Sequence, residues 1–165
     1  MGFKALSSKE RERILRQNWW GHDGLWFFHV ASELGFSKAN QMNKAINRAV
    51  GKMEMKNFLT ASGISIAEVQ QYMPDILKAN LEMCAADVFS IRYFKKVDDS
   101  LELAIDKCAA HTGTIKADYA GDYECACFKR IEGWLDAMDF HGSVRIAASL
   151  LKGENHCKIF IKLEK

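Results

Sequence analysis

The chain has 165 residues, 48% of them hydrophobic, which is enough to form one substantial core and predicts a single domain over residues 1–165. Its 23 Lys and Arg residues against 21 Asp and Glu leave a formal net charge of +2, and the basic residues are scattered, which argues against a nucleic-acid partner. No apolar run reaches signal-peptide or membrane-span length, so we expect a soluble, cytoplasmic protein without a membrane partner.

Residues 1–86 are predicted to form a helical N-terminal half. Ser7 and Glu10 match a capping box, so a first helix is expected to begin there. Its apolar periodicity runs to about Leu34, and Gly35 is placed as the glycine that ends it.

Two further helices are expected in this half. Ser37 is placed to cap the second helix, whose apolar residues recur at three- and four-residue steps and which is expected to end near Phe58. Ser65 and Glu68 form another capping box. Pro74, the only proline, marks the position where we expect a break and the start of a new helix.

Residues 87–165 are predicted to form a sheet with one helix. Apolar runs on either side of turn-forming residues at 98–100 and 153–156 indicate two hairpins. Between them, an apolar face at helical spacing predicts a helix over 126–140. The fold class is therefore α+β: a helical N-terminal half, then a four-stranded antiparallel sheet in the chain order strand-strand-helix-strand-strand.

The stretch NWWGHDGLWFF, residues 18–28, places Gly21 and Gly24 inside the first predicted helix. Each glycine costs a helix about 1 kcal/mol relative to alanine, so the two predict a kink, a break or a close approach by another backbone. The helical spacing puts His22 and Asp23 beside large aromatic side chains, including Trp26. The alternative is that GHDG separates two shorter helices and that His22 and Asp23 point to solvent.

Polar residues on the second predicted helix indicate a binding site. Asn40, Asn43, Asn47 and Glu54 follow at steps of three, four and seven, on one stripe. Asparagine is a poor helix former, and such local inconsistency is typical of functional sites. If the stripe faces the first helix, it forms a polar, aromatic-lined pocket for a small molecule. The alternative is a solvated helix face. The expected ligand-binding residues are His22, Asp23, Trp26, Asn43 and Asn47.

The five cysteines, an odd number, are expected to be reduced thiols and not a disulfide framework. Three segments that carry cysteines are expected to meet at one end of the sheet, where they would bind zinc or iron. The expected metal ligands are Cys108, His111, Cys125 and Cys157. The alternative for all of them, and our expectation for Cys84, is that they are small buried hydrophobes.

A catalytic role is a further alternative for the cysteines that open the predicted helix over 126–140. A cysteine at a helix N-terminus has a depressed pKa, which makes Cys125 or Cys127 the candidate nucleophile, with His111 or His156 as its base. In the neighbouring pocket, Glu54 is the candidate catalytic base.

The sequence resembles a prokaryotic family of soluble proteins of uncharacterised function. The resemblance rests on WWGHDGLWFFHVASELGFSKANQMN and the glutamate of KMEMKNF, and on the cysteines of the second half: Cys108 at a strand end, Cys125 or Cys127 after a glycine, and Cys157 at the last strand. The closing hairpin is also similar to the ends of L-2-amino-thiazoline-4-carboxylic acid hydrolase-like and 4-vinyl reductase-like domains. The family pattern implies a further cysteine near residues 147–151, where this chain has AASLLK, so a four-cysteine site would need His111 or His156 instead.

The sequence therefore predicts an α+β protein that binds a small molecule or a metal ion. Without catalysis, it would be a ligand- or metal-sensing module, and the expected partner is a second copy of the chain in a homodimer. The enzymatic alternative, by analogy alone, is a hydrolase acting on a C–N or C–S bond of a small heterocyclic carboxylic acid, through a cysteine nucleophile or a metal-bound water. A purely structural role is the third alternative.

Overall fold

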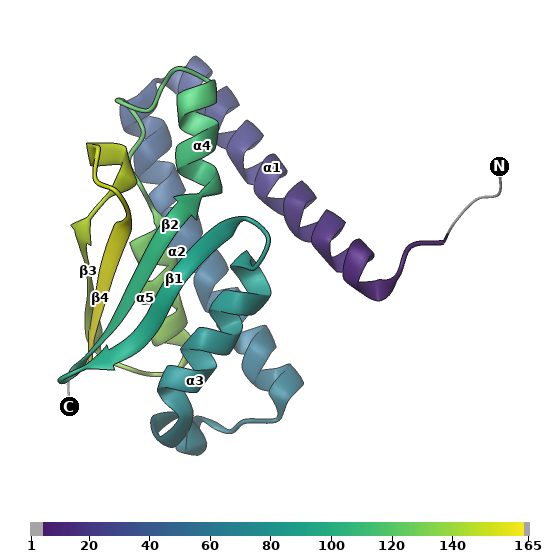
Figure 1. Cartoon of the computed structure of the whole chain (residues 1–165), viewed down its shortest axis with the longest axis vertical. Coiled ribbons are helices and arrows are strands. Elements are labelled where there is room, and N and C mark those ends of the chain that lie inside the picture. Colours follow the sequence, from purple (N-terminus) through teal and green to yellow (C-terminus); the bar gives the residue numbers. More distant parts are fainter. Residues whose placement is uncertain (1–4, 164–165) are drawn as a thin grey trace.

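The computed structural model describes residues 5–163 of the chain. The three predicted N-terminal helices are present: α1 (Ser8–Leu34), α2 (Phe36–Ser62) and α3 (Ile66–Ala85). They make up the helical first half of an α+β fold, as the sequence predicts (Figure 1).

Helix α1 has the predicted ends and no interruption. Ser7 caps it in a complete capping box with Glu10, and Gly35 follows it with φ 80°. The helix is continuous through residues 18–28, so GHDG does not separate two shorter helices. Gly21 and Gly24 therefore do not mark a break in the helix.

The boundaries of α2 and α3 differ from the expectation at two points. Helix α2 begins at Phe36, before Ser37, with no side-chain cap, and continues a turn past Phe58 because Leu59 is buried in the core. The capping box of α3 is confirmed, but Pro74 lies inside that helix, where a break was expected. Met73 before Pro74 and Ile76 and Leu77 after it pack into the core, and this burial offsets the hydrogen bond that proline cannot make.

The predicted four-stranded antiparallel sheet is confirmed, with the spatial order β1-β2-β4-β3. A short helix, α4, follows directly after β2 and was not expected. The elements of this half are β1 (Phe89–Val97), β2 (Ser100–Cys108), α4 (Ala109–Lys116), α5 (Cys127–Ala137), β3 (Gly142–Ala148), a 3-10 turn (Leu150–Lys152) and β4 (Cys157–Leu163).

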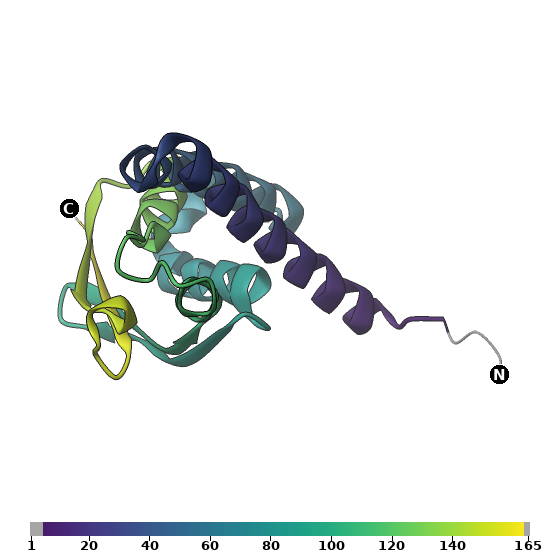
Figure 2. The same cartoon turned by 90° about the horizontal axis from the view of Figure 1, so that it is seen from above.

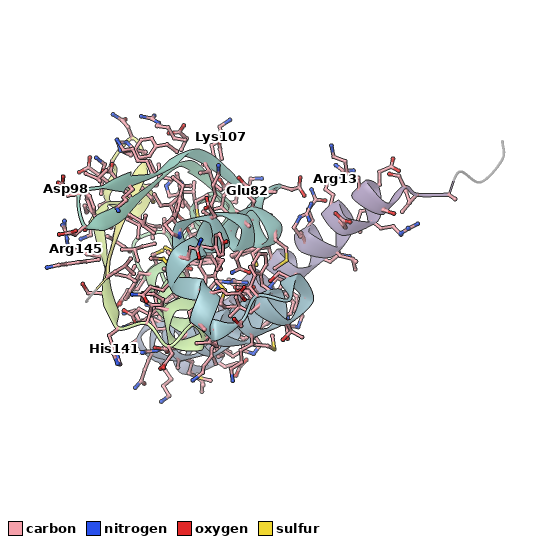
Figure 3. All side chains as sticks on the ribbon, turned by 90° about the horizontal axis from the view of Figure 1, so that it is seen from below. Arg13, Glu82, Asp98, Lys107, His141 and Arg145 are labelled. Atoms are coloured by element: carbon pink, nitrogen blue, oxygen red, sulfur yellow. The ribbon has the colours of Figure 1, made fainter. Side chains whose placement is uncertain are left out.

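The sheet curves around α5, and α2 packs on the other side of α5 (Figure 2). The inner face of the sheet buries Leu101, Leu103 and Ile159 against Ile131 and Trp134 of α5. The outer face is polar: Glu102 accepts hydrogen bonds from Tyr93 and, at 2.9 Å, from Lys158 Nζ. Arg145, labelled in Figure 3, lies on the strand β3 with its guanidinium over the ring of Phe160 in β4. The core thus lies on one side of the sheet, as is common for antiparallel sheets.

Two glycines let α2 and α5 cross with their backbones in contact. A Cβ atom placed on Gly51 would lie 2.1 Å from the carbonyl oxygen of Arg130, and one on Gly133 would lie 2.1 Å from that of Arg48. No larger residue fits at either position without moving a helix backbone. This close crossing brings side chains of α5 deep against α2.

Helix α1 packs on α2 only with its C-terminal part, through Phe27, Ala31 and Ala39, and its N-terminal part projects beyond the body (Figures 2 and 3). Two polar contacts hold the middle of α1 to the end of α3: Arg16 Nε lies 2.9 Å from Asp87 Oδ2, and Trp20 Nε1 donates to the Cys84 carbonyl at 3.0 Å. Within the described residues, no helix has both the length and the apolar character that a bilayer span requires.

Candidate functional site

A cavity of about 430 Å³ lies between α1, α2, α4 and the loop that leads into α5. Its walls are mainly apolar and aromatic, and polar side chains reach it at few points. From α1 it is lined by Trp20, Gly21, Asp23, Gly24 and Phe27; across from α1 it is lined by Phe89, Tyr119 and Tyr123; its polar and sulfur-containing lining comes from Asn43, Asn47, Arg130, Cys108, Cys125 and Cys127.

Arg130, on α5, borders the cavity in a buried ion pair. Its Nε lies 2.8 Å from Glu54 Oε2, its terminal nitrogen bonds the other carboxylate oxygen, and Trp134 Nε1 donates to Glu54 at 3.1 Å. The guanidinium carbon stacks 4.6 Å from the centre of the Trp20 ring. Burial favours the neutral form of Arg130, but its hydrogen bonds with Glu54 act in the opposite direction, and the net effect is a raised Arg130 pKa.

Asp23 is the carboxylate that α1 presents to the cavity. Burial raises its pKa, while the nearby Arg130 and His22 oppose the change. A carboxylate in such a place favours either a proton or a cationic partner. A ligand with a positive charge would therefore favour the ionised form of Asp23.

The asparagine stripe of α2 is buried and forms a network instead of a solvated face. Asn47 Nδ2 donates to Asn43 Oδ1 at 2.7 Å. Burial raises the pKa of Tyr123 well above its usual value, while a hydrogen bond with Asn43 acts in the opposite direction. The polar wall of the cavity is therefore fixed by contacts among its own members.

Asn40 and Lys44 hold the loop before α5 against α2. Asn40 donates to the carbonyl of Asp122 at 2.8 Å and accepts from the backbone N–H of Glu124 at 2.9 Å, while Lys44 pairs with the Glu124 carboxylate. Because one amide binds backbone on both sides of Tyr123, the loop has a defined position. This places Tyr123 and Cys125 at the cavity.

Gly21 and Gly24 face the cavity from α1. A Cβ atom at either position would have no atom within 4 Å, so neither glycine is explained by close packing. They leave an open strip of helix backbone along one wall of the cavity. The expected close approach is therefore wrong, and the glycines leave additional space in the cavity.

Cys125 and Cys127 are in direct contact, with their sulfur atoms 3.0 Å apart. The hydrogen bond between them lowers the pKa of Cys125 and raises that of Cys127 well above its usual value. Burial raises the pKa of Cys108 to about 11 and that of Cys84 to about 12. The sulfur of Cys157 accepts the backbone N–H of Leu150 at 3.3 Å.

A second cavity of about 440 Å³ lies on the other side of the loop before α5. It is lined by Lys44, Phe128, Ile146 and neighbouring residues of β3 and the 3-10 turn. Tyr123 and Cys125 line both cavities. The two spaces therefore share part of one wall.

The structure brings together only part of the predicted site. Asp23, Asn43, Asn47, Cys108, Cys125 and Cys127 line one cavity, whereas the predicted His22, Trp26, Glu54, His111 and Cys157 do not. His22 is exposed, and Trp26 packs beside Phe27 and Ala31. Both oxygens of Glu54 bind structural partners. Within residues 5–163, no three His, Cys, Asp or Glu side chains are arranged to hold a metal ion, and zinc or iron binding stays a prediction.

Three residues that line the cavity were not predicted from the sequence: Arg130, Trp20 and Tyr123. From the sequence alone, Arg130 is expected on the exposed face of an amphipathic helix. It is buried because α2 and α5 cross in close contact. A glycine in the middle of each of these helices was the available signal.

No family model matches the chain, and no curated protein sequence matches it. Among solved structures, it is similar to a trafficking protein particle complex subunit 3 from Naegleria fowleri covalently bound to palmitic acid, with a TM-score of 0.66 and 13% identity over 96% of this chain and 98% of that one. An H-NOX protein from S. oneidensis in the Fe(II)NO ligation state aligns with a TM-score of 0.47 and 10% identity over 100% of this chain and 80% of that one. At this identity the first likeness shows a shared α+β fold and nothing about activity.

Proposed function

We propose that this protein binds a small organic molecule with a largely apolar body and one polar end, in the cavity between α1, α2 and α4. The observation that carries the proposal is the cavity itself: about 430 Å³, mainly apolar and aromatic, with a few converging polar groups. These are the properties of known ligand pockets, which hold roughly 300–1,000 Å³.

The apolar body of the ligand would lie along the open strip of α1 at Gly21 and Gly24. Without side chains there, a flat or extended molecule approaches the helix backbone directly. Trp20 and Phe89 supply aromatic surface around it. Burying such a body contributes about 25 cal/mol per Å² of apolar surface, which is the main source of affinity in this proposal.

The polar end would face Asp23, Asn43 and Asn47. Arg130 is already paired with Glu54, so the unpaired charge of this wall belongs to Asp23. An amine or hydroxyl end therefore fits better than a carboxylate, which Asp23 would repel. The fatty acid in the structurally similar trafficking subunit makes a long acyl chain a suitable body for the probes, although that likeness extends only to the fold.

The experiment is a titration of the purified chain with dodecylamine, dodecanol and lauric acid below their micelle concentrations, followed by the fluorescence of Trp20 and its neighbours and by calorimetry. We expect saturable binding of one probe per chain, tightest for the amine. A Gly24→Leu variant should lose it, because its side chain fills the cavity, whereas Asn18→Leu, an exposed change on the same helix, should not. Equal binding by both variants would contradict the proposal.

A second function, thiol-dependent hydrolysis of a small molecule, is supported by one observation: Cys125, whose pKa is lowered, lines the cavity. None of the hydrogen bonds found within residues 5–163 joins a cysteine sulfur to a histidine side chain, so the base would have to be supplied by water or substrate. Loss of a ligand ester in the wild type but not in Cys125→Ser would favour this function over binding alone.

A further inference from the structure

Cys125 and Cys127 are the two cysteines whose side chains meet. Their sulfur atoms are 3.0 Å apart, about 1 Å more than the length of a disulfide bond. The contact forms across the N-terminus of α5, where Cys127 is the first helical residue and Ala126 precedes it.

The backbone between them already has the compact shape that a bridge needs. Ala126 has φ −109° and ψ 2°, which turns the chain and keeps Cys125 and Cys127 on the same side. Ala126 is 1% exposed, so this turn is held by the surrounding core. Joining the two sulfurs would bring them about 1 Å closer together.

Small reagents have two routes to the pair. Cys125 lines both cavities, and Cys127 lines the one beside α1. Cys125 is therefore the sulfur that borders both of these cavities, and Cys127 is in contact with it. An accessible thiol with a second thiol in contact is the arrangement of redox-active cysteine pairs.

We infer that Cys125 and Cys127 form a dithiol–disulfide couple that exchanges with low-molecular-weight disulfides such as glutathione disulfide. Cys125, as its thiolate, attacks one sulfur of the reagent, and the reagent's sulfur–sulfur bond breaks to release one thiolate. Cys127 then loses its proton to solvent and attacks Cys125 in the mixed disulfide, which releases the second. The reagent is reduced to two thiols and the protein is oxidised to one internal disulfide. This inference does not depend on the proposed ligand.

The sequence allows a direct test by peptide mapping. Trypsin places Cys125 and Cys127 together in the peptide 117–129, and Cys84, Cys108 and Cys157 each in a separate peptide, 79–92, 108–116 and 153–158. The reduced full-length protein is incubated with increasing glutathione disulfide in EDTA without oxygen, quenched in acid, alkylated in denaturant and digested.

We expect peptide 117–129 to carry no alkyl group and to be two hydrogens lighter than its free dithiol form, at a glutathione disulfide concentration about tenfold below that which modifies Cys108 or Cys157. Cys84, whose pKa burial raises to about 12, serves as the internal control. In Cys127→Ser a glutathione adduct should accumulate on Cys125, and Cys84→Ser should behave as the wild type. The inference is overturned if peptide 117–129 keeps both alkyl groups, or if Cys125 bridges to Cys108 or Cys157 instead. The wild-type map alone decides this, even if a serine variant fails to fold.

Discussion

Two pairs of helical glycines have opposite surroundings in this protein. At Gly51 and Gly133, the space of a Cβ atom is filled by the backbone of the facing helix, 2.1 Å away. At Gly21 and Gly24, the same space is empty, with no atom within 4 Å. The first pair marks a rigid contact between α2 and α5, and the second marks a wall of α1 that leaves room for another molecule. The same residue type can therefore report either close packing or a binding site, and only tertiary structure distinguishes them.

The largest effect is expected from breaking the ion pair at the rigid contact. Glu54→Ala leaves the buried guanidinium of Arg130 without its partner, and the loss of one member of such a pair costs about 3–5 kcal/mol. Urea unfolding followed by circular dichroism measures it. The matched control is Glu124→Ala, which removes an exposed partner of Lys44 and should cost less than about 1 kcal/mol. Similar losses for both would show that the Arg130–Glu54 pair is not stabilising the crossing.

The next effect tests the glycine contact directly. Gly133→Ala puts a methyl group against the carbonyl of Arg48, so α5 must move from α2, and we expect a loss of about 3 kcal/mol. For a chain of this size, the melting temperature should fall by about 6–12 °C, measured by calorimetry. An unchanged melting temperature would mean that the two backbones are not in contact.

Substitution of Gly21 or Gly24 should stabilise the protein, whereas substitution of Gly133 should destabilise it. Gly21→Ala and Gly24→Ala add a methyl group that meets nothing, so each should raise the free energy of unfolding by about 0.5–1 kcal/mol through helix propensity. The same changes should weaken binding of dodecylamine about tenfold, because the methyl groups occupy the ligand's space. Stabilisation without loss of binding would separate these glycines from the ligand site.

The smallest effect concerns Asp23 and its pH dependence. Burial raises the pKa of Asp23 in the folded state. Its contribution to the free energy of unfolding is therefore fully present below the unfolded-state pKa of about 3.9. That contribution is lost as the pH rises through the raised folded-state pKa. Asp23→Asn should therefore gain stability relative to the wild type between about pH 4 and pH 7. Urea midpoints across this range measure the difference. A gap that opens in favour of the wild type would contradict the assigned cause.

Local signals predicted the elements well, because they depend on neighbours in the chain. The capping boxes of Ser7 and Ser65 act within one turn, so the starts of α1 and α3 follow from sequence. Pro74 shows the limit of such rules, since the burial of Met73 and Ile76 keeps α3 continuous across it. The helix after β2 was missed because AAHTGTIK has weak helical periodicity and is held by tertiary contacts.

The candidate site was predictable only where the spacing of residues along a helix determines which of them share a helix face. The spacing of Asn43 and Asn47 predicts that they share one helix face, and both residues line the cavity that Asp23 borders from α1. Helical spacing could not decide whether Trp20 or Trp26 faces the cavity, because that depends on how α1 rotates against α2. Arg130 required the α2–α5 crossing to be known.

The wall shared by the two cavities has a mechanical consequence. Tyr123 and Cys125 border both spaces, and Asn40 ties the backbone beside them to α2. A molecule that displaces these side chains from one space reduces the volume of the other. Occupancies on the two sides of the loop are then coupled thermodynamically, and by reciprocity each changes the affinity of the other by the same factor.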